Sequence, residues 1–215
     1  MKVAVIGATG FVGSTIANEL ANRNIKVTGI SRQVKTTYSK LIDYIAVDVT
    51  NTQRLADVLK GHDVVISAFS PLINNPNLTE DFIAGSSAVT QAVKQAGVKR
   101  FILIGGAGSL LTANGEAIID TLPEDLPFVP KAKATKAYFE IFKQEKELDW
   151  AYFSPALEMN PSITIGRTGK YRLGTDYPVF DETGKNVLSV EDLAVVIADE
   201  VEHPKHHQIR FTAAY

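Results

Sequence analysis

Three glycines separated by two residues each lie close to the start of the chain, at Gly7, Gly10 and Gly13. They follow the apolar run Val3–Ile6 and open a helix-type segment. Glycines there permit a tight turn, close approach of a pyrophosphate and close helix–strand packing, while the helix N-terminus offers free N–H groups. An ordinary strand-to-helix turn is the alternative, but strand, glycines and helix coincide here. The spacing predicts a bound dinucleotide, held by Gly7, Thr9, Gly10, Phe11, Val12 and Gly13.

The end of the second expected strand should contact the adenosine ribose of that dinucleotide. An Asp or Glu there favours NAD, whereas an Arg suits the 2′-phosphate of NADP. The chain carries Ser31 and Arg32 and no acid nearby, so NADP is favoured and NAD stays an alternative. A solvated surface arginine is the other interpretation of Arg32.

Further cofactor contacts are expected where the other strands end, because open α/β sheets bind ligands at the carboxyl ends of their strands. Asp48 and Val49 would flank the adenine, and Gly105 and Gly106 would lie nearer the nicotinamide. Phe69 could equally be a core residue. The remaining expected contacts are Ala68, Ser70, Lys136 and Pro155.

Short apolar runs alternate with longer helix-type segments along the chain, which predicts a parallel sheet covered on both faces. We expect one Rossmann-type α/β domain over residues 1–215, doubly wound, with an irregular substrate-side segment over 155–185. Gly105–Pro130 is expected to be a long irregular connection, which in a compact domain is usually functional or mobile. The predicted strands are Lys2–Ile6, Ile25–Ile30, Ile42–Val47, Asp63–Ala68, Phe101–Ile104, Trp150–Phe153 and Gln208–Ala213. The predicted helices are Phe11–Arg23, Gln53–Lys60, Leu78–Ala96, Lys133–Lys146 and Ser189–Val201, the last capped by Ser189.

Composition narrows the classes of function. Hydrophobic residues make up 45% of the chain, as expected for a globular domain. The net charge of −2 gives no electrostatic reason to expect a nucleic-acid or membrane partner. Cysteine is absent, and Val3–Ile6 is too short for a signal peptide, so a cytoplasmic protein is expected. His203, His206 and His207 have no carboxylate at ligand spacing and predict a solvated loop rather than a metal site. The oligomeric state is not indicated.

The glycine turn resembles that of the atypical short-chain dehydrogenase/reductases. Further motifs extend the resemblance over most of the chain: Ser31-Arg32, Asp48-Val49, Gly105–Ser109, Phe153–Ala156 and Ser189–Ala194. Together they resemble the NmrA-like branch, which includes NADH-flavin reductases and epimerase/dehydratase-like proteins. The resemblance implies a Rossmann fold and a nicotinamide dinucleotide. It leaves the reaction open, because that branch mixes reductases with redox sensors that bind the cofactor without chemistry.

One departure from that family bears on mechanism. Its dehydrogenases and epimerases use Tyr-x-x-x-Lys, in which the tyrosine exchanges a proton with the substrate oxygen. Here Lys136 fits the lysine position, but Ala132 stands where the tyrosine would be, and Tyr138 lies on a different helical face. Ser109 lies near the position of the family's catalytic serine. Ser109 and Lys136 are therefore the candidate catalytic residues.

The sequence thus favours an NAD(P)H-binding oxidoreductase that reduces a flavin or a similar flat acceptor. Hydride transfer to a flavin needs stacking and orientation more than a protein proton donor. A non-catalytic redox sensor and an epimerase/dehydratase-like enzyme remain alternatives. The acceptor is expected between Phe69–Asn75, Gly106–Leu111 and Pro155–Asn160, with polar contacts from Ser70, Asn74, Ser109 and Glu158.

Overall fold

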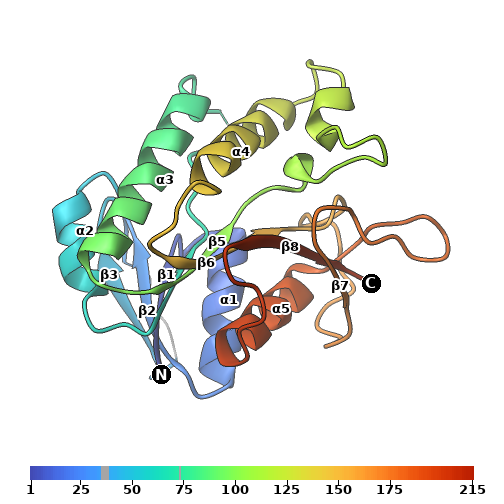
Figure 1. The fold of residues 1–215 in the computed structure, drawn as a ribbon. Helices are drawn as coiled ribbons and strands as arrows, with labels where there is room; N and C mark the ends of the chain where they lie inside the picture. Colours follow the sequence, from blue (N-terminus) through green and yellow to red (C-terminus); the bar gives the residue numbers. More distant parts are fainter. Residues whose placement is uncertain (35–38, 73) are drawn as a thin grey trace.

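The centre of the molecule is an eight-stranded sheet (Figure 1). The structure is a computed structural model that describes residues 1–34, 39–72 and 74–215. The strands are β1 (Lys2–Ile6), β2 (Lys26–Ser31), β3 (Ile42–Ala46), β4 (Val64–Ser67), β5 (Arg100–Ile104), β6 (Asp149–Ser154), β7 (Arg172–Gly174) and β8 (Ile209–Ala214). Their spatial order is β3-β2-β1-β4-β5-β6-β8-β7, and every pairing is parallel except that of β7 with β8. This order confirms the predicted doubly wound Rossmann fold.

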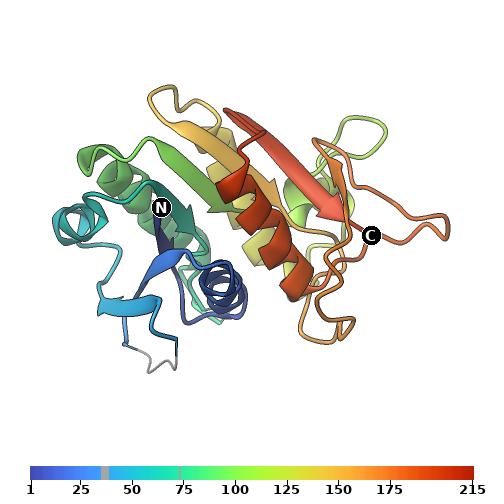
Figure 2. The same cartoon turned by 90° about the horizontal axis from the view of Figure 1, so that it is seen from below.

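Helices cover both faces of the sheet (Figure 2). The helices are α1 (Phe11–Asn22), α2 (Thr52–Leu59), α3 (Leu78–Gln95), α4 (Val129–Phe142) and α5 (Val190–Glu202), with 3₁₀ turns η1 (Ala107–Ser109) and η2 (Ile118–Thr121). α1 and α5 pack on one face, and α2, α3 and α4 on the other. The central strands are apolar almost throughout because both of their faces are buried.

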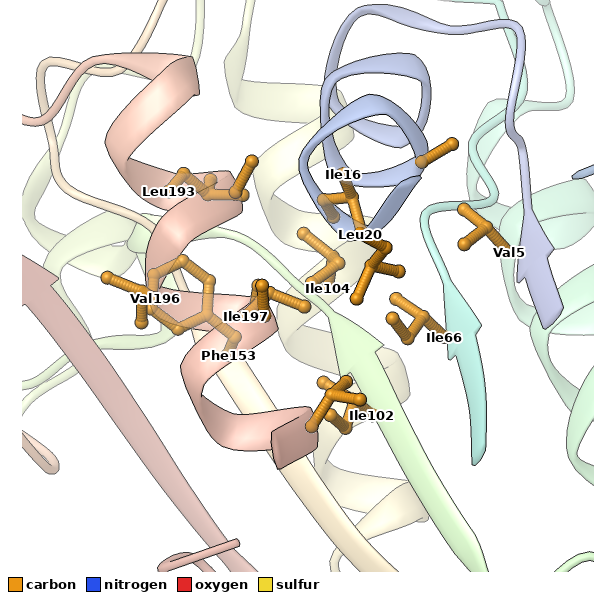
Figure 3. Close-up of a cluster of buried hydrophobic side chains, with 14 of the residues drawn as sticks. Val5, Ile16, Leu20, Ile66, Ile102, Ile104, Phe153, Leu193, Val196 and Ile197 are labelled. Atoms are coloured by element: carbon orange, nitrogen blue, oxygen red, sulfur yellow. The ribbon is translucent and has the colours of Figure 1, made fainter. Parts of the chain in front are cut away.

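An apolar core between α1, α5 and the sheet holds α1 in position (Figure 3). Ile16 and Leu20 of α1 point toward Ile66 of β4 and Ile104 of β5, and all four are buried. Each fully buried side chain of this size stabilises the folded protein by roughly 1.5–3 kcal/mol. α1 is therefore held against the sheet, with its N-terminus at the carboxyl ends of β1 and β4.

The helix expected over Lys133–Lys146 lies earlier in the chain, at Val129–Phe142. The sequence predicts Pro130 in the preceding loop, but it lies in the first turn of α4. The N–H groups of that turn have no partner within the helix, so a proline there removes no helical hydrogen bond. The cap predicted at Ser189 is confirmed, because its hydroxyl accepts a hydrogen bond from the Asp192 N–H at 3.0 Å. The 155–185 segment is irregular apart from β7, as expected. In the described part of the chain, no helix combines the length and apolarity needed to cross a membrane.

Candidate functional site

The glycine turn joins β1 to α1 through unusually close backbone contacts. Gly7 has a φ of 79°, in the left-handed region, and its N–H donates to the Ile30 carbonyl at 2.8 Å. A Cβ on Gly7 would lie 2.5 Å from the Ala68 carbonyl oxygen, and one on Gly13 would lie 2.3 Å from the Gly7 carbonyl oxygen. Both positions require glycine, because they let the backbones of β1, β4 and α1 touch.

The first turn of α1 is open to an anion. Gly10 is the N-cap, and no side chain caps the helix. Within the described residues, the N–H groups of Thr9, Phe11, Val12 and Gly13 have no hydrogen-bond partner. No acidic side chain occupies that turn, so the positive end of the helix dipole is not neutralised. The turn fits the pyrophosphate of a dinucleotide, which would accept hydrogen bonds from these groups.

Arg32 and Asp48 lie at the ends of the neighbouring strands β2 and β3. Arg32 is exposed and makes no hydrogen bond or ion pair with any described residue. Asp48 accepts hydrogen bonds from the Thr50 N–H at 3.0 Å and the Thr50 hydroxyl at 2.8 Å, and these bonds, helped by the nearby Arg32 charge, lower its pKa. The Ser31 hydroxyl donates to the carbonyl of Gln33. An exposed guanidinium that makes no hydrogen bond or ion pair with a described residue thus lies beside the expected ribose position.

Phe69 packs inward from the end of β4. A Cβ on Gly85 would lie 2.5 Å from the Phe69 ring, and the ring stacks on Phe82 with centroids 6.3 Å apart. Phe69 therefore has a packing role, in addition to the backbone position beside the cofactor that the sequence predicts. Ser70 is exposed, and its hydroxyl donates to the Pro71 carbonyl at 3.1 Å.

Ser109 is a buried residue of the segment that follows β5. Its hydroxyl donates to the Gly106 carbonyl at 3.0 Å and lies 3.3 Å from the hydroxyl oxygen of Ser154 on β6. Gly106 itself contacts Thr135 of α4, whose Oγ1 would lie 2.6 Å from an added Cβ. The Ser109 hydroxyl is thus bound within the protein at the carboxyl ends of β5 and β6.

Arg210 of β8 holds this segment in place, and the sequence analysis did not identify it. Its guanidinium donates to the Ser109 carbonyl and to the Asp176 carboxylate, and lies 4.8 Å from the centre of the Phe139 ring. Arg210 is buried, and its contacts are far away in the sequence. The one available signal was a charged residue within the otherwise apolar and small strand Ile209–Ala214.

Ala132 and Lys136 both face the connection between β5 and α4. A Cβ on Gly108 would lie 3.1 Å from the Cβ of Ala132, which packs in a small cluster with Ile119. The Lys136 ammonium forms an ion pair with Asp120 of η2. The two positions that correspond to the family's catalytic pair therefore lie against residues 107–121, and both are partly buried.

Tyr138 lies in the core, away from these positions. Its hydroxyl donates to the Ser86 carbonyl at 2.9 Å, and its oxygen lies 2.7 Å from the Thr90 hydroxyl oxygen. Burial raises the pKa of Tyr138 to about 12. This placement agrees with the prediction that Tyr138 does not replace the missing catalytic tyrosine.

The expected acceptor end carries exposed apolar side chains from separate strand-to-helix connections. They are Phe11 after β1, Leu72 after β4, Phe128 before α4 and Leu157 after β6, each between 41% and 67% exposed. Pro155 is buried, whereas Asn74 and Glu158 are exposed near these connections. The parallel topology brings all of these connections to one edge of the sheet.

Sequence and structure comparisons place these features in a known family. The model of the NAD(P)H-binding family matches residues 7–204. A candidate epimerase from Bacteroides thetaiotaomicron is 42% identical, with a TM-score of 0.88 over 100% of this chain and 96% of that one. A candidate exported protein from Burkholderia pseudomallei is 34% identical, with a TM-score of 0.88 over 100% of both chains. A candidate NADH-flavin reductase from Streptococcus pneumoniae is 29% identical, with a TM-score of 0.85 over 100% of this chain and 99% of that one. The chain therefore belongs to the NAD(P)H-binding family, as its resemblance to the NmrA-like atypical short-chain dehydrogenase/reductases predicts.

Proposed function

We propose that this protein is an NADPH-dependent reductase of a flat, flavin-like acceptor that works without a tyrosine proton donor. NADPH, when bound, supplies the hydride. The observation that carries the proposal is the placement of Ala132, which occupies the tyrosine position and packs against Gly108 and Ile119. Carbonyl reduction and epimerisation by the standard route need a proton donor at that position. Transfer to a flavin needs mainly that both rings be held in register.

The proposed cofactor site runs along the carboxyl ends of the strands. The free N–H groups of α1 would bind the pyrophosphate, and Arg32 would bind the 2′-phosphate, which favours NADPH over NADH. Arg32 supports this preference because it is exposed, makes no hydrogen bond or ion pair with a described residue, and no acidic residue follows β2 directly.

The proposed acceptor site uses the exposed apolar side chains at the same edge. Phe11, Leu72, Phe128 and Leu157 offer apolar surface to a planar ring. The name of the Streptococcus pneumoniae relative, a candidate NADH-flavin reductase, agrees with this class of acceptor. The polar contacts proposed at this end are Ser70, Asn74, Ser109 and Glu158.

Two of the proposed residues would have to exchange partners to act on a ligand. The Ser109 hydroxyl would have to turn away from the Gly106 carbonyl, and Lys136 would have to leave Asp120. Ser109 and Lys136 are thus proposed contacts whose present hydrogen bonds compete with that role.

Anaerobic oxidation of NADPH, followed by absorbance, tests the proposal with riboflavin, FMN, FAD and a quinone as acceptors. The expected result is turnover with flavins, faster with NADPH than with NADH. Tight NADPH binding without turnover on any acceptor would instead favour a redox-sensing protein. Reduction of small ketones with no flavin turnover would contradict the proposed mechanism.

A further inference from the structure

Lys131 lies on the inner face of α4, at the end of the helix nearest the candidate site. Residues three, four and seven positions further on, Ala134, Thr135 and Tyr138, are all buried. Side chains with this spacing share one face of a helix, so Lys131 continues the buried stripe by one more turn. Thr135, the next residue of that stripe, contacts Gly106 at the end of β5. Lys131 is therefore placed beside the carboxyl end of β5.

Lys131 differs from its neighbours in having no counter-ion. Lys133 pairs with Glu124 and Lys136 pairs with Asp120, whereas Lys131 has neither an ion pair nor a hydrogen bond among the described residues. The residue is only partly exposed, and burial lowers the pKa of its ammonium. A partly desolvated charge without a partner destabilises the folded protein. Such a residue beside the carboxyl ends of the strands, where this fold binds ligands, points to a ligand that supplies the opposite charge.

We propose that Lys131 is the positive charge of the acceptor end and selects an acceptor that becomes an anion when it is reduced. This inference rests on the function proposed above. In the reaction, the C4–H bond of the nicotinamide breaks and an N5–H bond forms on the flavin. The electron pair moves to the N1–C2=O edge of the flavin, which becomes an anion. No proton is taken from the protein, and the ammonium of Lys131 would stabilise the new negative charge.

Binding of oxidised and reduced riboflavin to the protein saturated with NADP⁺ tests this role directly. Riboflavin has no phosphate, so only its ring can respond to Lys131. Dissociation constants are measured anaerobically for the wild type, Lys131→Met and Lys131→Arg. Oxidised FMN is titrated in the same way, and NADPH is titrated against the protein without NADP⁺. Lys133→Met is the matched control, because it removes a charge from the outer face of the same helix. We expect the wild type to bind reduced riboflavin at least about tenfold more tightly than the oxidised form. Lys131→Met should abolish this preference, while Lys131→Arg and Lys133→Met should keep it.

The other outcomes separate the inference from the proposed function. Equal affinity of the wild type for both redox forms, with flavin turnover intact, would overturn the role of Lys131 alone. A Lys131→Met variant that weakens NADPH binding and leaves the flavin preference unchanged would assign Lys131 to the cofactor instead. Weaker binding of oxidised FMN, with riboflavin unaffected, would assign it to the flavin phosphate. No binding of either riboflavin form to the wild type would overturn both proposals.

Discussion

The guanidinium of Arg210 donates a hydrogen bond to the carbonyl oxygen of Ser109, which joins the last strand of the sheet to the segment that follows β5. The same guanidinium binds Asp176 and lies over the Phe139 ring. One buried side chain thus links β8, the 175–177 turn, α4 and η1. The position of Ser109 at the site depends on β8, although β8 contributes no predicted cofactor contact.

Arg210→Met should destabilise the protein and loosen the segment around Ser109. The substitution leaves the Ser109 carbonyl without its donor and Asp176 without its partner, and removes the contact with Phe139. Leaving the buried Ser109 carbonyl without its donor costs about 1–3 kcal/mol, whereas the lost pair with Asp176, whose side chain is 52% exposed, adds little. Urea denaturation measures this change. Arg54→Met is the control, because Arg54 is exposed and its guanidinium makes no hydrogen bond or ion pair with a described residue. Equal stability of the two variants would contradict the role assigned to Arg210.

Gly13→Ala should mainly lower stability, whereas Gly10→Ala should mainly lower the affinity for NADPH. A Cβ at position 13 would lie 2.3 Å from the Gly7 carbonyl oxygen, so the backbone must move, at a cost of roughly 1–3 kcal/mol. A Cβ at position 10 would meet only the Gly7 carbonyl oxygen, at 3.4 Å, so the loss of stability should be about 1 kcal/mol or less. It would, however, stand where the pyrophosphate approaches the helix. Thermal unfolding and NADPH titration check both variants. Normal NADPH affinity in Gly10→Ala would argue against the phosphate site.

Arg32→Ala should weaken NADPH binding about tenfold or more and leave NADH binding unchanged. A charge-assisted hydrogen bond to a phosphate is worth about 1.5–3 kcal/mol, and NADH has no 2′-phosphate to lose it. Fluorescence titration with both dinucleotides measures the difference. Lys26→Ala is a suitable control, because it removes a positive charge from the opposite end of the same strand. An unchanged preference for NADPH in Arg32→Ala would contradict the proposed cofactor specificity.

The parallel sheet and the glycine turn could be predicted because each leaves a local signal. β1, β4 and β5 each consist of an apolar run with one polar or charged residue at an end, and the glycine turn begins directly after β1. Such signals need no knowledge of distant contacts. The boundaries of α4 were less predictable, because Pro130 suits both a loop and the first turn of a helix.

The arrangement of the 105–130 connection could not be predicted. Some of its contacts join residues far apart in the sequence, and others join nearby residues whose spacing is not that of a helix or strand. Ala117, Ile119 and Val129 form a small apolar cluster with no helical or strand period between them. The bond between Arg210 and Ser109 joins residues from opposite ends of the second half of the chain. One sequence cannot distinguish the paired Lys136 from the unpaired Lys131, because the difference comes from Asp120 in η2.

Asp192→Asn should lower the free energy of unfolding at neutral pH and make it depend less on pH in the acid range. Burial alone would raise the pKa of Asp192, but hydrogen bonds from Thr168, Gly169 and Tyr215 outweigh it and lower the pKa. Because the folded pKa lies below the unfolded value of about 3.9, the carboxylate stabilises the fold above that value. This stabilisation is lost as pH falls through the folded pKa.

Urea denaturation at neutral and at acid pH measures the contribution of Asp192. At neutral pH the Asn variant should be less stable by about 1–3 kcal/mol, and the gap should narrow in acid. Asp125→Asn, at an exposed position, is the control. A gap that stays constant down to the lowest pH would mean that the charge of Asp192 is not what stabilises the fold.

Ala132→Tyr should fail to create a carbonyl reductase, although it completes the Tyr-x-x-x-Lys pattern with Lys136. Ala132 packs against Gly108 and Ile119, so a tyrosine there must displace residues 107–121, at a cost of about 1–3 kcal/mol. Glu140→Tyr controls for an added tyrosine on the exposed part of the same helix. Thermal unfolding and NADPH oxidation with small ketones test both variants. If Ala132→Tyr were as stable as Glu140→Tyr and reduced ketones, the packing of Ala132 against Gly108 and Ile119 would not be the reason that this chemistry is missing.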